Sequence, residues 1–203
     1  DIDGCGSANG KCKTVGYGLS LWHKVLKTEV MVCGLALYEE KWVFEWRRVK
    51  IERCTGDGEL AVHVTAGEGT AFCSVGRLSV ELSGMSFVVS DMSADDGCLF
   101  ALTNSGSLTL ENVSISPSTA YSVGFTVPLF MLTSGSLTLT HVSVSGFTMD
   151  GCAVFSHSVN SRIGASDVNV SNINRTTGNG SVFEKTLVGS ESFGVNGMKF
   201  ENC

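Results

Sequence analysis

Carboxylate side chains are the residues of this chain that could cleave a polysaccharide. Asp91, Asp95 and Asp96 lie close together in a Ser/Ala/Gly-rich segment, and glycoside hydrolysis needs two carboxyl groups that act as acid and base. No Gly-His-Gly or Arg-Ile-Lys sequence accompanies them, and Arg162-Ile163-Gly164 lacks the second cation. Asp is also a common turn residue. We therefore interpret Asp95-Asp96 as a turn and assign no catalytic residue.

The remaining reactive side chains form no recognisable site. The histidines are scattered along the chain at His23, His63, His141 and His157. No CxxC pair or zinc-ligand spacing is present, so neither a metal nor a cofactor is expected. The tryptophans could form a platform for sugars, but their position near the start of the chain favours covering one end of a core: Trp22, Trp42 and Trp46.

Cysteines and glycosylation sequons favour an extracellular or cell-surface location. The closest cysteines, Cys5 and Cys12, flank a Gly/Ser/Asn-rich loop, and we predict a disulfide between them. The other six are interpreted mainly as small buried side chains. Four Asn-x-Ser/Thr sequons predict glycosylation candidates, at Asn112, Asn169, Asn174 and Asn179.

Net charge argues against nucleic acid as a partner, and the length of the apolar runs argues against a membrane span. A net charge of −6 argues against nucleic acid, which needs a basic face. No apolar run is long enough to cross a bilayer as a helix, so we expect no membrane span in this segment. The one basic run, Arg47 to Arg53, alternates with Phe44, Trp46, Val49 and Ile51, and therefore predicts the exposed face of an amphipathic strand.

The strands that would position any site are predicted by an internal sequence repeat. The segments 99–115 and 129–144 are nearly the same sequence, and both contain two apolar pairs with the spacing apolar-x-apolar-x-x-apolar-x-apolar. Six copies of this pattern begin at residues 44, 80, 108, 137, 163 and 193. Their spacings of 36, 28, 29, 26 and 30 residues predict a solenoid.

The extra residue between the two pairs predicts a sharp corner. In a straight strand it would send the second pair to the opposite face, so the strand must bend to keep both pairs inside. A residue of such a bend adopts a positive φ, which Gly, Asn, Asp and His tolerate best. The six copies place there, in order, Arg48, Gly84, Asn112, His141, Asp167 and Gly197.

A third apolar element completes each coil. It enters through Gly or Pro and ends in Phe100, Phe130, Phe155 or Phe183. Three strands per coil without helices predict an all-β, right-handed parallel β-helix of about six to seven coils. Residues 1–28 are assigned to an N-terminal cap with a short helix, and residues 29–203 to the β-helix. Because the last copy stops in mid-coil, we expect more chain or a partner to follow it.

The paired elements resemble the GGAI and FxxN repeats of polymorphic outer-membrane autotransporter passengers and of related pectin-lyase-fold surface proteins of protists. Gly97-Cys-Leu-Phe100, Gly151-Cys-Ala-Val-Phe155 and Gly180-Ser-Val-Phe183 are similar to the first motif, and Phe200-Glu-Asn202 to the second. The start of the chain, from Cys5 to Thr14, is similar to the cysteine-bounded start of such β-helices. The resemblance implies a secreted surface protein.

We therefore expect a non-enzymatic extracellular β-helix that acts in adhesion or surface display, with a carbohydrate or a host or neighbouring cell-surface protein as partner. Its Ser/Thr-rich outer face and the lack of an acid/base set favour this hypothesis. The alternative is a carbohydrate-active lyase or hydrolase whose site is missing or lies around residues 91–96. A third possibility is a degenerate domain that serves only as a spacer.

Overall fold

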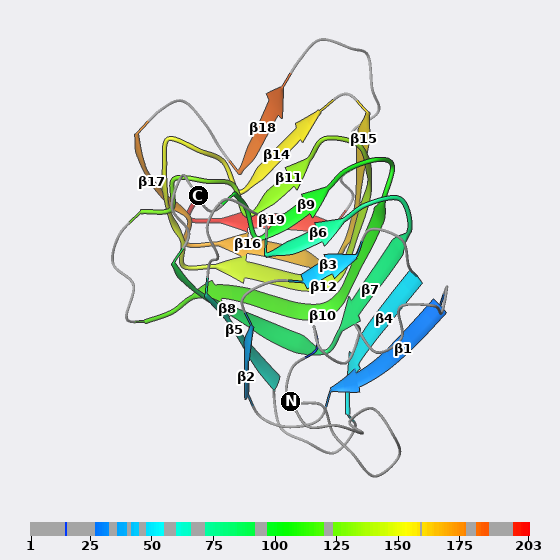
Figure 1. The fold of residues 1–203 in the computed structure, drawn as a ribbon. Helices are drawn as coiled ribbons and strands as arrows, with labels where there is room; N and C mark the ends of the chain where they lie inside the picture. The colour runs from blue at the N-terminus through cyan, green and yellow to red at the C-terminus, as the bar shows by residue number, and fades with distance from the viewer. Residues whose placement is uncertain are drawn as a thin grey trace.

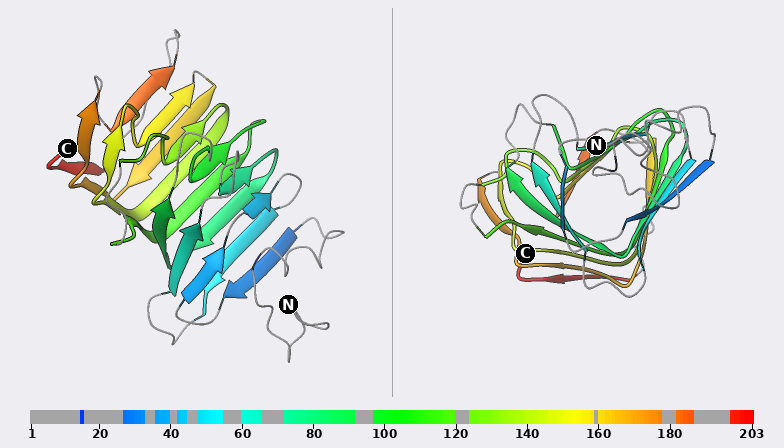
Figure 2. Two further views of the ribbon diagram at one scale, coloured as in Figure 1. Left: turned by 60° about the vertical axis from the view of Figure 1, so that its left-hand side comes forward. Right: turned by 60° about the horizontal axis from the view of Figure 1, so that its bottom comes forward.

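The chain folds into an all-β parallel solenoid, seen here in a computed structural model (Figure 1). Strands from successive coils lie side by side, and the view along the axis shows the coils stacked on one another (Figure 2). The structure describes residues 15, 27–32, 36–39, 42–44, 48–54, 60–65, 72–91, 97–119, 124–158, 160–177, 182–186 and 197–203. Of the predicted cap, residues 1–26 lie outside this set except Val15, which is helical and buried.

Each coil contributes strands to three parallel ladders, as the repeat predicts. The first ladder contains the strands before the corner: β1 (Lys27–Val32), β4 (Arg48–Arg53), β7 (Ser79–Ser83), the first parts of β10 (Ser107–Pro117) and β12 (Gly135–Ser145), and β15 (Ser161–Ser166). The second ladder contains the strands after it: β2 (Ala36–Glu39), β5 (Leu60–Thr65), β8 (Met85–Asp91), the second parts of β10 and β12, β16 (Val168–Ser171) and β19 (Met198–Glu201). Since β10 and β12 run through the corner, these ladders form one 11-stranded sheet.

The third ladder is a separate 6-stranded sheet. It is built from the short strands β3 (Trp42–Phe44), β6 (Cys73–Val75), β9 (Phe100–Leu102), β11 (Phe130–Leu132), β14 (Phe155–Ser158) and β18 (Phe183–Thr186). A 2-stranded sheet of β13 (Thr148–Asp150) and β17 (Asn174–Thr177) lies between the second and third ladders in the chain. The solenoid has about four turns, so the expected six to seven coils are too many. Within the described residues, the end coils are paired on one side or only in part.

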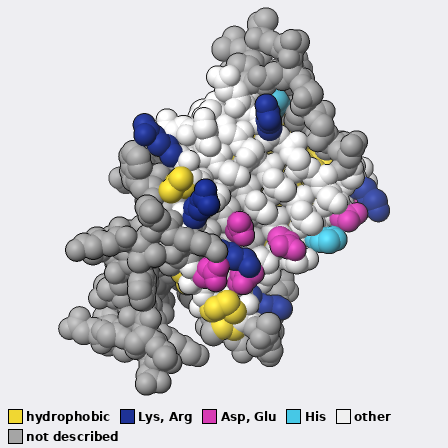
Figure 3. Space-filling view, turned by 90° about the vertical axis from the view of Figure 1, so that its right-hand side faces the viewer, with side chains coloured by type: hydrophobic (Ala, Val, Ile, Leu, Met, Phe, Trp, Pro, Cys, Tyr) yellow, Lys and Arg dark blue, Asp and Glu magenta, His cyan; other side chains and the backbone are white. Residues whose placement is uncertain are grey.

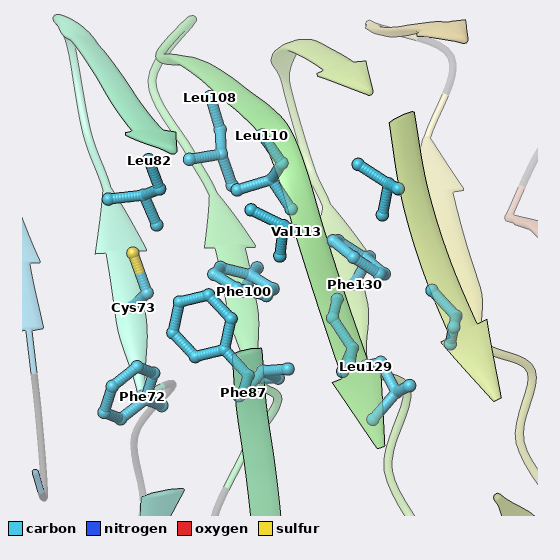
Figure 4. Close-up of a cluster of buried hydrophobic side chains, with 14 of the residues drawn as sticks. Phe72, Cys73, Leu82, Phe87, Phe100, Leu108, Leu110, Val113, Leu129 and Phe130 are labelled. Carbon is cyan, nitrogen blue, oxygen red and sulfur yellow. The ribbon is translucent and has the colours of Figure 1, made fainter. Parts of the chain in front are cut away.

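The apolar pairs of the repeat stack into continuous columns that fill the core. Leu108 and Leu110 of β10 pair in register with Leu137 and Leu139 of β12, and all four are fully buried. After the corner, Val113 lies beside Val142. Figure 4 shows side chains from several coils meeting in this interior. Parallel stacking places like residues on like, so every coil buries its apolar side chains against those of the next.

A column of aromatic rings runs through the third ladder. Phe100, Phe130, Phe155 and Phe183 lie in register on neighbouring strands. Their rings are stacked, with centroid separations of 5.1, 4.6 and 4.8 Å and interplanar angles of 18°, 11° and 17°. The third element predicted from the sequence is thereby confirmed. On the two strands before Phe100, the same register position is occupied by Cys73 and then by Trp42.

The predicted alignment of the first copy of the repeat is wrong. Val49 and Ile51 lie beside Val80 and Leu82, so they form the first apolar pair of their coil. The second pair is Leu60 and Val62, which lie beside Met85 and Phe87. Six residues, 54–59, separate the two halves of this coil, where the pattern assumed a direct bend. Phe44 belongs instead to β3 of the third ladder.

A second column of corners follows the second apolar pair by two residues. Gly146, Asn172 and Asn202 all have positive φ, of 81°, 54° and 55°. The side-chain amide of Asn202 donates from Nδ2 to Oδ1 of Asn172 at 3.2 Å. The fixed offset of two residues from Val144, Val170 and Phe200 is visible in the sequence, but it lies outside the pattern of two apolar pairs.

Candidate functional site

The corner predicted from the sequence is confirmed at five positions. The backbone of Gly84, Asn112, His141, Asp167 and Gly197 has φ values of 73°, 52°, 51°, 53° and 86°. In the coil before them, Arg53 and not Arg48 reaches this level, because Glu52 pairs with Ser83 and Arg53 lies against Gly84. Arg48 is exposed at the start of β4, and the alternation of exposed and buried residues predicted for the basic run holds over β4.

The corner column forms one wall of an open groove of about 440 Å³. A Cβ built on Gly84 would lie 3.4 Å from Cβ and 3.9 Å from Nε of Arg53, which are ordinary contact distances, so the Arg53 side chain lies beside this position. Ser86 and Ser114 face the groove from the following residues of the second ladder, with their Oγ atoms 2.5 Å apart. The full lining is Arg53, Gly84, Met85, Ser86, Asn112, Val113, Ser114, His141 and Ser143.

The polar side chains of the groove belong to neighbouring coils. His141 follows Asn112 one coil further along, and its Nε2 lies 3.4 Å from Oδ2 of Asp167. Both of these side chains are more than half exposed, so their attraction contributes little to stability. The groove therefore offers a guanidinium, an amide, an imidazole and three hydroxyls, without a buried carboxylate among its lining residues.

Columns of hydroxyl groups cover the outer face of the first ladder next to the corner. Ser79, Ser107 and Ser136 lie in register on three coils, and Ser136 donates to Oγ of Ser107 at 3.1 Å. Thr109 and Thr138 form a parallel column two residues further along the strands. These side chains point outward because their neighbours in the strand are the buried pair of the repeat.

Charged side chains occupy the N-terminal part of the same face. Glu29, Lys50 and Glu81 lie in register on β1, β4 and β7, and Nζ of Lys50 lies 2.5 Å from Oε1 of Glu52. The hydrogen bond with Glu52 is the main cause of a raised pKa of Lys50, with Glu81 and Glu29 adding to it. Figure 3 shows acidic side chains close to one another on part of this face, with Lys and Arg side chains beside them and at separate places elsewhere.

The three described sequons differ in their surroundings. Asn112 is exposed at the corner, within the groove. Asn169 is half-buried between Ser143 and Lys199, and its Oδ1 is buried without a hydrogen-bond partner. Asn174 is exposed at the start of β17. The fourth candidate, Asn179, lies outside the described residues.

One side chain of the Asn174 sequon is already engaged. The Thr176 hydroxyl donates to Oδ1 of Asp150 at 2.9 Å, and the Thr177 hydroxyl donates to the same oxygen at 2.5 Å. These two hydrogen bonds, that of Thr177 first, lower the pKa of Asp150.

The cysteines include both a disulfide and free thiols. Cys54 is disulfide-bonded. Cys5 and Cys12 lie outside the described residues, so their predicted bridge stays a prediction. Among the described residues, the cysteines that form no disulfide are Cys73, Cys98, Cys152 and Cys203. Burial raises the pKa of the Cys73 thiol well above its ordinary value and that of Cys98 to about 12, as the interpretation of these residues as buried core predicts.

No catalytic constellation is present among the described residues. His63, His141 and His157 lie on β5, at the corner and on β14, and so on separate ladders or coils. Asp91 ends β8, while Asp95, Asp96 and His23 lie outside the part of the chain that is described. Trp42 is 1% exposed in the core, as predicted for an end of the core, and forms no sugar platform; Trp22 and Trp46 are not among the described residues.

Two further features are absent from the described residues. In the described ranges, no three His, Cys, Asp or Glu side chains converge as a metal site would require. No helix within those ranges has the length and hydropathy of a membrane span. Comparison of the chain with family models, curated proteins and solved structures finds no match.

Proposed function

We propose that this chain is the solenoid of a non-enzymatic extracellular or cell-surface protein that acts in adhesion or surface display. Its partner would be a carbohydrate or a protein of a host or neighbouring cell surface. The observation that carries the proposal is the outer face of the first ladder, where hydroxyl columns such as Ser79–Ser107–Ser136 and Thr109–Thr138 lie in register.

A rigid hydroxyl array is suited to binding a repetitive polar surface. Parallel strands hold successive hydroxyl-bearing residues of one column about 4.8 Å apart, and the packed core prevents the strands from shifting. Ser and Thr have short side chains, so little conformational entropy is lost when they are ordered by a ligand. Each net hydrogen bond contributes only about 0.5–1.5 kcal/mol, but a face that repeats one group makes many such contacts at once.

Two features support an extracellular location. The disulfide at Cys54 is typical of proteins that fold in an oxidising compartment. Two of the described sequons, at Asn112 and Asn174, lie on exposed residues. The aromatic column through Phe100, Phe130 and Phe155 also supports the proposed relationship to the pectin-lyase-like passengers and protist surface proteins that the repeats resemble.

The test is binding of the purified chain to immobilised dextran, polygalacturonate and fixed epithelial cells. We expect retention on at least one surface, and a loss of about 30-fold in affinity when Thr109→Val and Thr138→Val are combined. This estimate removes two hydroxyls at about 1 kcal/mol each while keeping the shape of the side chain. Thr126→Val, at an exposed threonine outside the face, is the matched control and should bind as the unaltered chain does.

The same samples test the enzymatic alternative. Polygalacturonate is incubated with the chain, and new reducing ends or unsaturated products are measured. Product release that Asp95→Asn with Asp96→Asn abolishes would overturn the proposal in favour of a lyase or hydrolase. Failure to bind any of the three surfaces, without product release, would favour a spacer.

A further inference from the structure

The corner groove contains a sequon in its own lining, and this coincidence indicates what occupies it. Asn112 and Ser114, the first and third residues of the sequon, both line the groove. We propose that Asn112 carries an N-linked glycan and that the corner groove seats its first saccharide. The inference rests on the proposed extracellular function, because glycan transfer takes place in the secretory pathway.

Glycosylation of Asn112 uses an oligosaccharide donor linked to a polyprenyl diphosphate and is catalysed by a transferase. Nδ2 of Asn112 attacks C1 of an oligosaccharide linked to a polyprenyl diphosphate. The new N–C1 bond forms as the C1–O bond breaks, the lipid diphosphate leaves with the electron pair, and Nδ2 gives up one proton to a base of the transferase. The Ser114 hydroxyl that the transferase reads is paired with Ser86 in the fold, so transfer precedes closure of the corner.

The fold then presents the modified side chain without steric conflict. Asn112 is exposed and has a φ of 52°, while the next residue, Val113, is buried. The Asn112 side chain is therefore accessible at the corner. Asn169 differs, since its amide oxygen is buried between neighbouring coils and a glycan there would have to displace it.

The groove supplies polar partners on both sides of the attachment point. Arg53 lies beside Gly84, one coil before Asn112, and His141 occupies the corner one coil after it. Ser86 and Ser143 also line the groove. These donors and acceptors match the hydroxyl and acetamido groups of an N-acetylhexosamine, and about 440 Å³ lies within the range of small-molecule sites, about 300–1,000 Å³.

Asn174 serves as the internal comparison. It is exposed and forms part of a sequon, but it lies outside the groove lining. A glycan at Asn174 should therefore project into solvent, whereas the first saccharide at Asn112 should be held against the protein.

The test expresses the chain behind a secretory leader in a glycosylating eukaryotic host, followed by glycopeptide mass spectrometry. We expect a glycan on Asn112, and loss of that glycan alone in Asn112→Gln and in Ser114→Ala. After trimming to a single N-acetylglucosamine, full removal of the sugar should lower the melting temperature of Asn174→Gln protein, which retains only the Asn112 site among the described exposed sequons. Arg53→Met should reduce this shift, while Arg162→Met, at an exposed arginine outside the groove, should leave it unchanged.

Three results would overturn the inference. They are an Asn112 peptide found only unmodified in the secreted protein, a melting temperature that does not respond to removal of the Asn112 sugar, and a shift that Arg53→Met leaves intact. Since the leader forces secretion, each would leave the adhesion proposal standing. Conversely, failure of the chain to bind dextran, polygalacturonate or cells would not affect the glycan assignment.

Discussion

Replacing Phe130 by alanine should destabilise the middle of the solenoid more than any surface change. Phe130 is fully buried and stacks on both sides, against Phe100 at 5.1 Å and against Phe155 at 4.6 Å. Because the coils of a solenoid contact only their neighbours, this ring contributes to two successive interfaces between coils. Its loss would weaken the connection between the N-terminal and C-terminal coils.

The magnitude follows from burial and ring geometry. Truncating a buried Phe to Ala costs about 3–5 kcal/mol, and a site with stacked rings on both sides should lie in the upper half of that range. Phe130→Leu keeps most of the volume, so its packing cost is below about 1.5 kcal/mol. It also removes two aromatic pairs, each worth about 0.5–1.5 kcal/mol beyond buried area. We therefore expect a loss of about 2–3 kcal/mol in the free energy of unfolding for Phe130→Leu.

The assay is urea unfolding followed by circular dichroism, in a double-mutant cycle. Phe130→Leu and Phe155→Leu, singly and together, should give a coupling energy of about 0.5–1.5 kcal/mol. As a control, Phe130→Leu combined with Ile51→Val, in β4 of a distant coil, should be additive within about 0.5 kcal/mol. A Phe130–Phe155 coupling no larger than the control would refute the reasoning, because the rings would then only fill volume.

Two further predictions concern the corner and the buried thiols. His141→Gly should raise the free energy of unfolding by up to about 1 kcal/mol, since φ is 51° there, and His141→Val should lower it by about 1–2 kcal/mol; equal stability of the two variants in urea would contradict the corner. Burial raises the pKa of the Cys73 and Cys98 thiols above 9.0, to about 12 for Cys98. Above about pH 9 the unfolded chain loses these protons while the folded chain keeps them, so the free energy of unfolding is highest below about pH 9 and falls as the pH rises further. The expected slope is about 1.4 kcal/mol per pH unit per thiol. Cys73→Val should reduce this alkaline slope in urea titrations between pH 9 and 11; an unchanged slope would show that Cys73 does not contribute.

The sequence predicts well wherever one coil repeats the chemistry of the next. Residue type and spacing alone predict corners at Gly84, Asn112 and His141, and the φ values of these residues confirm them. The first coil was misaligned because residues 54–59 separate its two halves. A pattern of fixed spacing cannot represent such an insertion, and Phe44 supplied an apolar residue at the expected distance from Val49 although it belongs to another sheet.

Residue type and repeat spacing could not predict the groove. Arg53 and Asn112 are far apart in the chain, and Gly84 between them has the signature of a corner only. Only the fold brings the Arg53 side chain beside Gly84. Likewise the sequons at Asn112 and Asn169 have the same sequence, Asn-Val-Ser. Only the fold distinguishes them, because it exposes Asn112 and partly buries Asn169.

By itself the sequence determined the period, the apolar pairs that face the interior and most of the first corner column. These are local properties: alternation along a strand and tolerance of positive φ depend on a residue and its neighbours in the chain. The tertiary structure decided the register of the first coil, the length of the stacked Ser and Thr columns and the composition of the groove. These depend on which residue of one coil lies beside which residue of the next, and loops of unequal length set that pairing.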